Sequence, residues 1–548
     1  MERPLLGSLV NTRRFLPIGV VLLLAGCASV PGDQPTEVSD APSQPTAAEP
    51  AERASGRDAN ADPAASATAE PPAPPRDLWA RIRRGYAIPG HDNARVQAQY
   101  EHFRGLDGYW QRVSERAHPY LFHIVEALDA RDMPMELALL PIVESAFRPF
   151  AYSHGRAAGI WQFIPATGRH YGLEQNWWYD GRRDVLAATD AALTYLEYLA
   201  EMFDGDWLLA VAAYNGGEGT VSRAIERNRQ AGRPTDYWSL ELPRETMNYV
   251  PKLLAISELV ADPAAHGIAL QPIPNEPVVD AVTLERQVDL ALAAELAGLD
   301  IETLYRLNPG YNRWATAPHG PHRLLLPLEN IPAFRRGLAQ TPESDWLRWQ
   351  RHRIARGETL GEIADRYHVT VDTLKQSNGI DGHIIRAGDH LLVPVASRPS
   401  GQYRLSADAR RQARQRTGPD NRQRRQYTVQ AGDSFWAIAR RHGVGVRELA
   451  RWNGMAPGDT LSIGEQLVIW SNGPVQQTAV DTGAGPVDRL QSVTYTVRSG
   501  DSLYLIAQRF NVAVADLQRW NNIAEGSYLQ PGQRLRLRVD VTAQSGGR

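Results

Sequence analysis

The C-terminal third of this 548-residue chain contains one motif three times. In each copy a glycine, an acidic residue, a hydroxyl residue and a large apolar residue stand together, and an asparagine follows at the same offset. The copies are Gly357, Glu358, Thr359, Leu360 and Asn378; Gly432, Asp433, Ser434, Phe435 and Asn453; and Gly500, Asp501, Ser502, Leu503 and Asn521. Repetition at one offset predicts three similar folding units, and the chain is too long for a single core.

Each unit has the same predicted order of secondary structure. A short strand precedes the glycine, as at 427–429, and an apolar helix pattern follows it. An extended apolar run such as 391–394 closes the unit. Two helices fit between these strands, so each copy is predicted to be a small strand-helix-helix-strand (βααβ) module.

A weaker fourth copy precedes the other three. Leu290, Leu304 and Asn308 stand where the last copy has Leu503, Leu517 and Asn521. Gln287 replaces the glycine, which argues against sugar binding at this copy. We expect this degenerate copy to pack against the domain that precedes it.

The segment 77–264 is predicted to be rich in α-helix. Its clearest helix has apolar positions in steps of four and three, and Asp184 is the expected cap: Val185, Thr189, Ala192, Leu196, Leu199 and Phe203. A second apolar helix, 208–214, should stop at Gly216 and Gly217. No alternating strand pattern competes before Pro274.

Glu144 is the leading catalytic candidate within this helical segment. It follows the apolar run 139–143 and precedes Ser145. Burial among apolar neighbours raises the pKa of a carboxyl group and keeps it protonated near neutral pH, as a general acid requires. The alternative from position alone is a structural glutamate that pairs with Arg148 or caps a helix.

Three further motifs follow Glu144 in order, at 159–163, 213–217 and 249–252. Together with Glu144 and Ser145 they resemble the family 1 lytic transglycosylases, which have a lysozyme-like SLT domain and cleave the glycan strand of peptidoglycan. The resemblance implies that Glu144 is acid and then base, and that five residues contact or adjoin the sugar: Ser145, Gln162, Tyr214, Asn215 and Tyr249. Trp161 and Phe163 are expected to fill the core.

The resemblance also implies the reaction. The enzyme would cut the β-1,4 bond between N-acetylmuramic acid and N-acetylglucosamine, and the muramyl 6-hydroxyl would attack C1 to give a 1,6-anhydro product. One alternative is a goose-type lysozyme-like hydrolase that uses water, for which Asp180, Asp184 or Asp190 could supply a second carboxylate. The other is a non-catalytic peptidoglycan-binding scaffold, against which the intact Glu144 argues.

The repeated units resemble LysM modules, which bind polymers of N-acetylglucosamine. In that family the sugar lies between the loop after the first strand and the loop after the second helix. The resemblance implies glycan binding by the motif residues: Gly357, Thr359, Asn378, Gly432, Asp433, Ser434, Asn453, Gly500, Asp501, Ser502 and Asn521.

The N-terminus predicts export and a lipid anchor. Arg13 and Arg14 precede the apolar stretch 15–24, which is too short for a comfortable membrane span and leads to Cys27. This pattern resembles the lipobox of bacterial lipoproteins, and Ala28 favours the periplasmic face of the outer membrane. Residues 29–75 are rich in Ala, Pro, Ser and Thr and predict a flexible tether.

Composition excludes several other chemistries. A net charge of −3 gives no general attraction to nucleic acid, and none is expected as a partner. The single cysteine excludes an internal disulfide and a cysteine zinc cluster. The sequence after Gly216 lacks a phosphate-loop lysine, and there is no His-Glu-x-x-His motif. We expect no cofactor and no metal, and the sequence identifies no synthase or amidase partner.

The predicted fold is therefore multidomain, with an α-rich lysozyme-like catalytic domain followed by small α+β modules. The expected divisions are a signal peptide 1–26, a tether 27–76, a catalytic domain 77–264, a degenerate LysM-like module 275–330, LysM modules 350–395, 427–470 and 493–539, and linkers 396–426 and 471–492. The first linker is rich in Arg and Gln and is expected to be solvated. Its alternative interpretation is a contact with teichoic-like or lipid phosphates.

Overall fold

The computed structural model describes residues 75–89, 92–367, 369–471 and 490–497, with parts of 503–540. The predicted signal peptide, Cys27 and nearly all of the tether lie outside these residues. Gly500, Asp501 and Ser502 also lie outside them. None of the described helices combines the length and hydropathy that crossing a bilayer requires.

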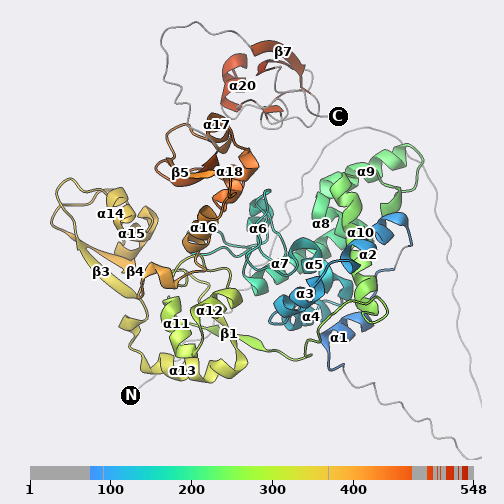
Figure 1. Cartoon of the computed structure of the whole chain (residues 1–548), viewed down its shortest axis with the longest axis horizontal. Helices are drawn as coiled ribbons and strands as arrows, with labels where there is room; N and C mark the ends of the chain where they lie inside the picture. Colours follow the sequence, from blue (N-terminus) through green and yellow to red (C-terminus); the bar gives the residue numbers. More distant parts are fainter. Residues whose placement is uncertain are drawn as a thin grey trace, which may run out of the picture. The chain divides into compact units, whose positions relative to one another are not determined.

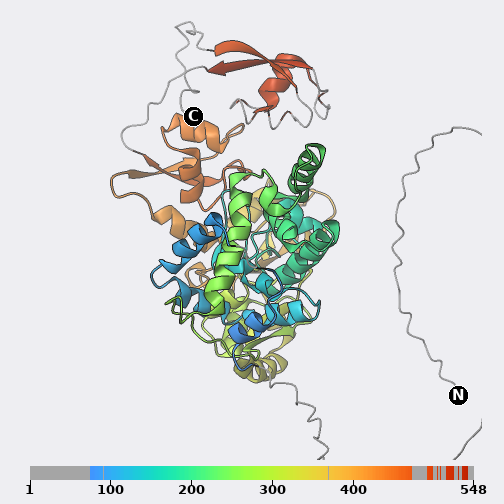
Figure 2. The same ribbon diagram turned by 90° about the vertical axis from the view of Figure 1, so that its right-hand side faces the viewer.

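The first part of the described chain is helical, as predicted (Figures 1 and 2). Several helices begin at a side-chain cap that accepts backbone N–H groups, including α1 at Asp77, α7 at Asp184 and α8 at Asp206. The elements are α1 (Leu78–Arg84), α2 (Ala94–Arg104), α3 (Tyr109–Ala117), α4 (Leu121–Asp129), η1 (Met135–Leu139), α5 (Leu140–Ser145), α6 (Pro165–His170), α7 (Val185–Met202), α8 (Trp207–Gly216), α9 (Glu218–Gln230), η2 (Tyr237–Ser239) and α10 (Arg244–Ala261).

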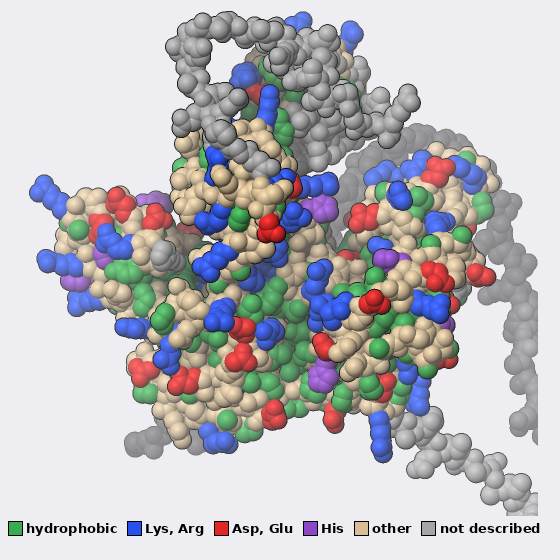
Figure 3. All heavy atoms as spheres, in the orientation of Figure 1, with side chains coloured by type: hydrophobic (Ala, Val, Ile, Leu, Met, Phe, Trp, Pro, Cys, Tyr) green, Lys and Arg blue, Asp and Glu red, His purple; other side chains and the backbone are tan. Residues whose placement is uncertain are grey.

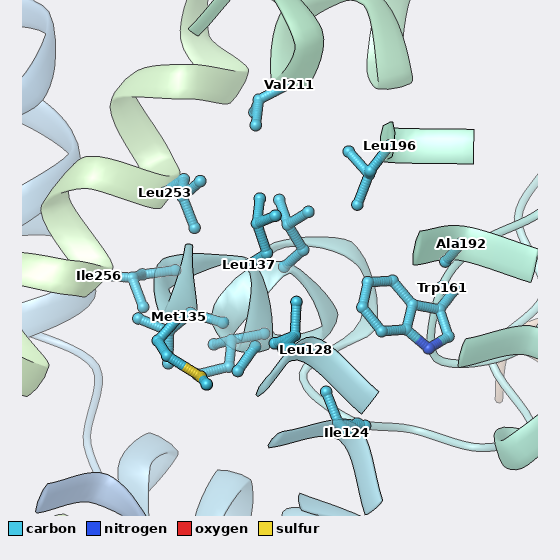
Figure 4. Packing of buried hydrophobic residues seen from close by; sticks show 14 of the residues in the cluster. Ile124, Leu128, Met135, Leu137, Trp161, Ala192, Leu196, Val211, Leu253 and Ile256 are labelled. Atoms are coloured by element: carbon cyan, nitrogen blue, oxygen red, sulfur yellow. The ribbon is translucent and has the colours of Figure 1, made fainter. Parts of the chain in front are cut away.

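These helices surround one apolar core (Figure 4). The predicted stripe of α7 is buried along its length, and α8 ends at Gly216, so both helix predictions are confirmed. Trp161 is fully buried and its Nε1 donates to Thr189 Oγ1 at 2.9 Å. Phe163 is also buried, so the expected packing of both aromatic side chains is confirmed.

Four two-stranded antiparallel sheets follow, each within a module of its own. The first module contains β1 (Val279–Thr283), α11 (Leu290–Ala297), α12 (Ile301–Leu307), β2 (Arg323–Pro327), η3 (Leu328–Asn330), α13 (Ile331–Gln340) and η4 (Glu343–Asp345). The second contains β3 (Arg348–Arg353), α14 (Leu360–Tyr367), α15 (Val371–Asn378) and β4 (His390–Val395). The third contains β5 (Gln423–Thr428), α17 (Phe435–Arg441), α18 (Val446–Trp452) and β6 (Gln466–Ser471), and the fourth contains β7 (Leu490–Thr496), α20 (Val514–Asn521) and β8 (Arg534–Asp540).

The first of these modules packs against the helical domain. The backbone N–H of Asp180 donates to the carbonyl of Gly310 at 2.8 Å. Arg323 forms an ion pair of 2.8 Å with Asp184, the residue that caps α7. The prediction that the degenerate copy packs against the preceding domain is confirmed by these contacts.

The repeated asparagine has a structural explanation. In every module its side-chain amide donates to a carbonyl one helical turn earlier and to a carbonyl of the closing strand, and its oxygen accepts an N–H from that strand. We call this arrangement the asparagine clamp; it is formed by Asn308, Asn378, Asn453 and Asn521. Because the clamp uses the amide groups within the module, these residues hold the fold, and glycan binding by Asn378, Asn453 and Asn521 stays a prediction.

The segment 396–426 is not a solvated linker along its whole length. It contains η5 (Ser400–Gln402) and α16 (Ala407–Arg416), which Ser406 caps. The N–H of Ala407 donates to the carbonyl of Asn312 at 2.8 Å, and Asp408 forms an ion pair with Arg313. Arginine composition indicated solvation, but these tertiary contacts order the helix.

Candidate active site

Glu144 lies in the last turn of the short helix α5. The two residues after Ser145 leave the helix with unusual backbone angles, φ 51° at Ala146 and φ 55° at Phe147. Residues other than glycine rarely adopt a positive φ, and such strain gathers at functional sites. The fully buried Phe147 ring and two backbone hydrogen bonds to α5 hold this turn, so the direction of the chain after the acid is fixed.

The surroundings of Glu144 bring the pKa of its carboxyl group close to neutral pH. Burial raises the pKa of Glu144 to about 7. Tyr249 opposes this rise, because its hydroxyl donates a hydrogen bond to Glu144 Oε1, and the charge of Lys252 acts in the same direction. Within the described part of the chain Oε2 accepts no hydrogen bond, so it is available to carry the acid proton.

The structural alternative for Glu144 does not hold. Arg148 does not pair with it; the Arg148 Nε donates to the carbonyl of Ser145 at 2.9 Å. Tyr249 comes from α10, which lies 105 residues later in the chain. A partly buried acid that meets a tyrosine from a distant helix is typical of a catalytic arrangement.

Ser145 joins the acid helix to the loop that carries Gln162. Its hydroxyl is buried and lies 3.0 Å from the carbonyl of Ile160 and 3.2 Å from that of Pro141. This arrangement makes Ser145 a positioning residue, and its expected contact with the sugar stays a prediction. Gln162 has φ 51° and donates from Nε2 to the carbonyl of Gly159 at 2.7 Å.

Gly159 fixes where this loop runs. Its φ is 80°, and a Cβ atom added there would lie 1.9 Å from the carbonyl oxygen of Arg182. No side chain fits at this approach. The loop with Gln162 is therefore held closely against the segment that contains Arg182.

Tyr214 and Asn215 are held at the end of α8. The Tyr214 hydroxyl donates to the carbonyl of Trp161 at 2.9 Å, and Asn215 Oδ1 accepts from Thr246 Oγ1 at 2.9 Å. Both side chains remain partly exposed. The negative charge of Glu144 contributes to a raised pKa of Tyr214, after the larger effect of burial. The structure thus brings Tyr214 into the electrostatic neighbourhood of the acid.

The three candidates for a second carboxylate have other partners. Asp180 pairs with Arg182 and Arg183, and Asp184 caps α7 and accepts from the Tyr179 hydroxyl. Asp190 is exposed and pairs with Arg131. Glu245 is the carboxylate whose charge affects the pKa of Glu144, and it lies exposed in the first turn of α10. These contacts favour a reaction with one carboxylate.

Sequence reasoning missed the support around these residues. Thr246 donates a hydrogen bond to Asn215. It also lies close to Gly216, since a Cβ atom added at Gly216 would be 2.7 Å from the Thr246 hydroxyl oxygen. Tyr195 connects the rings of Tyr171 and Tyr214, with ring centres 5.0 and 5.5 Å apart. Thr246 precedes Tyr249 by one helical turn, which is the signal that could have identified it.

The predicted LysM binding residues are found in two described loops. Gly357 and Gly432 both have φ 84°, which a tight turn requires of glycine. Thr359 accepts from the N–H of Glu362, Ser434 caps α17, and Asp433 accepts from the N–H of Gln430. These side chains shape the two loops through local hydrogen bonds.

Models of known protein families match separate segments of the chain. A model described as "Transglycosylase SLT domain" matches residues 123–236, and one described as "Lytic transglycosylase MltD, LysM-like domain" matches 278–342. The LysM domain model matches 352–394, 427–470 and 495–538. Tyr249 lies beyond the SLT match, although it contacts Glu144.

Similar proteins include relatives that span most of the chain. Membrane-bound lytic murein transglycosylase D of Escherichia coli K12 is 37% identical over 467 residues, which cover 85% of this chain and 86% of the relative. A putative tributyltin chloride resistance protein of Alteromonas is 48% identical over 125 residues, 23% of this chain and 60% of that protein. The solved 70 kDa soluble lytic transglycosylase of Escherichia coli is 17% identical, over 34% of this chain and 41% of that one, with a TM-score of 0.22.

Proposed function

The chain belongs to the lytic transglycosylases that join an SLT domain to LysM modules, and we propose that Glu144 alone supplies the acid and the base of its reaction. The observation that carries this proposal is the partly buried carboxyl group with a pKa of about 7, in contact with Tyr249. The proposed substrate is the β-1,4 bond between N-acetylmuramic acid and N-acetylglucosamine.

The proposed reaction moves one proton out and one proton back. Protonated Glu144 gives its proton to the oxygen of the bond to be cut, and that C1–O bond breaks with an oxocarbenium-like centre at C1. The Tyr249 hydroxyl stabilises the carboxylate that forms. Glu144 then accepts the proton of the muramyl 6-hydroxyl, while the oxygen of that hydroxyl bonds to C1. The acid is restored, a 1,6-anhydro end forms, and no water is consumed.

Reaction in oxygen-18 water tests this scheme. We expect digested sacculi to release anhydro ends without label, as measured by mass spectrometry. Reducing ends that carry oxygen-18 would instead assign the goose-type hydrolase reaction. The proposed sugar contacts are Gln162, Tyr214 and Asn215, which are partly exposed; the charge of Glu144 acts on Tyr214.

The LysM modules are proposed to bind the glycan strand that the catalytic domain cuts. Several weak sites on one chain raise the local concentration of substrate, so their contributions to affinity multiply. We expect truncation after Pro394 to weaken binding to sacculi strongly and to leave cleavage of short soluble fragments nearly unchanged. Equal pull-down of both forms would show that the last two modules are spacers.

We further propose that Cys27 anchors the protein by lipid to the periplasmic face of the outer membrane. The lone cysteine after a short apolar stretch supports this, and the name of the Escherichia coli relative, membrane-bound, agrees with it. Cys27→Ala should abolish the lipid mass at the N-terminus and the fractionation with outer membranes. An unchanged distribution would exclude this anchor.

A further inference from the structure

A cavity of about 430 Å³ lies beside the catalytic domain, and six of its fourteen lining residues are arginines. Its lining joins the loop after α5, the segment before α7, helix α16 and the loop after α18. We call it the arginine cavity, after six of its residues: Arg156, Arg182, Arg183, Arg410, Arg411 and Arg414. Figure 3 shows Lys and Arg side chains, in blue, gathered where Figure 1 labels α16.

Carboxylates balance only part of this positive charge. Asp180 pairs with Arg182 at 2.8 Å and with Arg183 at 3.1 Å. Asp459 pairs with Arg156 at 2.9 Å, and Glu465 pairs with Arg411. Three carboxylates thus pair with four of the six guanidinium groups. Within the described chain neither Arg410 nor Arg414 forms an ion pair.

Two of the arginines are held in a costly position. Burial, followed by the charge of Arg183, lowers the pKa of Arg410 to about 9. Its guanidinium stacks 4.4 Å from the ring centre of Phe150. The Arg183 side chain is only 13% exposed, and its buried Nε has no hydrogen-bond partner in the described part of the chain. A buried donor without a partner destabilises a fold unless a ligand satisfies it.

We propose that the arginine cavity binds an oxyanion. Clustered guanidinium groups match the oxygen pairs of carboxylates and phosphates, and such a ligand would offset the repulsion between Arg183 and Arg410. The Arg-rich segment 396–426 was alternatively interpreted as a contact with phosphates. The cavity gives such a contact a defined place, which residues of α16 and of the catalytic domain line together.

The position of Arg182 favours an anion attached to the substrate. Its Nη1 donates to the carbonyl of Arg156 at 2.7 Å and lies 3.3 Å from the carbonyl of Phe163. The same residue therefore lines the cavity and holds the loop that carries Gln162. If the chain cuts peptidoglycan as proposed, the carboxylates of the peptides attached to the glycan would supply the oxyanion; free phosphate shares its chemistry.

Calorimetry on the full-length protein in detergent tests the proposal. Citrate and inorganic phosphate are titrated at an ionic strength fixed with chloride, into wild type and into the double variant Arg410→Gln, Arg414→Gln. The matched control is Arg416→Gln, Arg447→Gln, which removes the same charge from two exposed residues outside the cavity. We expect the cavity variant to bind citrate at least tenfold more weakly and the control to bind within twofold of wild type.

A second pair of titrations distinguishes the source of the anion. A muramyl disaccharide that carries its peptide is compared with the same disaccharide after removal of the peptide. Stronger arginine-dependent binding of the first assigns the peptide carboxylates, whereas equal binding together with arginine-dependent phosphate binding assigns free phosphate. Equal citrate affinity of wild type, cavity variant and control would overturn the proposal.

Two further variants keep the test independent of folding and catalysis. Arg414→Gln alone changes an exposed side chain at the cavity, so its weaker citrate binding is measurable even if the double variant does not fold. Glu144→Gln should bind citrate as wild type does. Loss of cleavage and loss of anion binding are therefore separate results.

Discussion

In the catalytic domain Glu144 and Tyr249 come from positions 105 residues apart and meet once, whereas in the small modules the asparagine clamp recurs four times and each time joins atoms of a single module. Glu144 stood out in the sequence as an acid after an apolar run, whereas the asparagine stood out by its repeated offset from a glycine. The contact between Glu144 and Tyr249, which occurs once, is proposed to serve catalysis. The asparagine clamp, which recurs, stabilises the fold of each module. Repetition alone is thus evidence for structure before it is evidence for binding.

Glu144→Gln is the strongest test of the catalytic half of this comparison. The amide cannot donate or accept the catalytic proton, so we expect turnover of purified sacculi to fall by about 10³-fold or more. Tyr249 can still donate to the Gln carbonyl, so circular dichroism and sacculus binding should match wild type. Retained cleavage would mean that another carboxylate carries the reaction.

Asn453→Ala tests the structural half. Its amide is fully buried, and its loss leaves the carbonyls of Leu449 and Val468 and the N–H of Val468 without partners. We expect its module to lose about 3 kcal/mol of unfolding free energy in denaturant titrations. Asn378→Ala, at a partly exposed clamp, should cost about 1 kcal/mol and serves as control. Unchanged stability together with weaker glycan binding would instead assign Asn453 to contact with the sugar.

The sequence was informative where the cause of a pattern is local. The period of α7, its cap at Asp184 and the burial of Trp161 follow from spacing and side-chain type. The contact between Glu144 and Tyr249 depends on tertiary packing, and only the family resemblance suggested it. The clamp depends on which strand passes the asparagine, and the ordering of α16 depends on contacts with Asn312 and Arg313 that no local pattern encodes.

The pH dependence of stability sharpens the catalytic half further. The pKa of Glu144 is about 7 in the fold, against 4.5 for an exposed glutamate, so the folded state binds more protons between these values. Wild type should therefore lose stability as pH rises from 4.5 to 7. Glu144→Gln lacks this titration and should be about 1–3 kcal/mol more stable than wild type at pH 8, with little difference at pH 4. Parallel urea titrations at both pH values measure it.

Tyr249→Phe should have the smallest effect. In wild type the Tyr249 hydrogen bond lowers the pKa of Glu144. Its removal should therefore raise that pKa and shift the alkaline limb of the pH–rate profile to higher pH. The carboxylate formed after proton transfer also loses a donor, so we expect turnover to fall about 3- to 10-fold. An unchanged pH–rate profile would mean that Tyr249 does not affect Glu144 during the reaction, and that their contact, like the asparagine clamp, is structural.

The asparagine clamp has a consequence for how such chains evolve. Since every clamp bond joins atoms of one module, a gene can duplicate or delete the stretch that encodes a module without disturbing a clamp in its neighbours. The clamp itself therefore sets no limit on the number of modules. Contacts with the catalytic domain do set one: the first module makes them through Gly310 and Arg323, and the third makes one through Asp459, which pairs with Arg156.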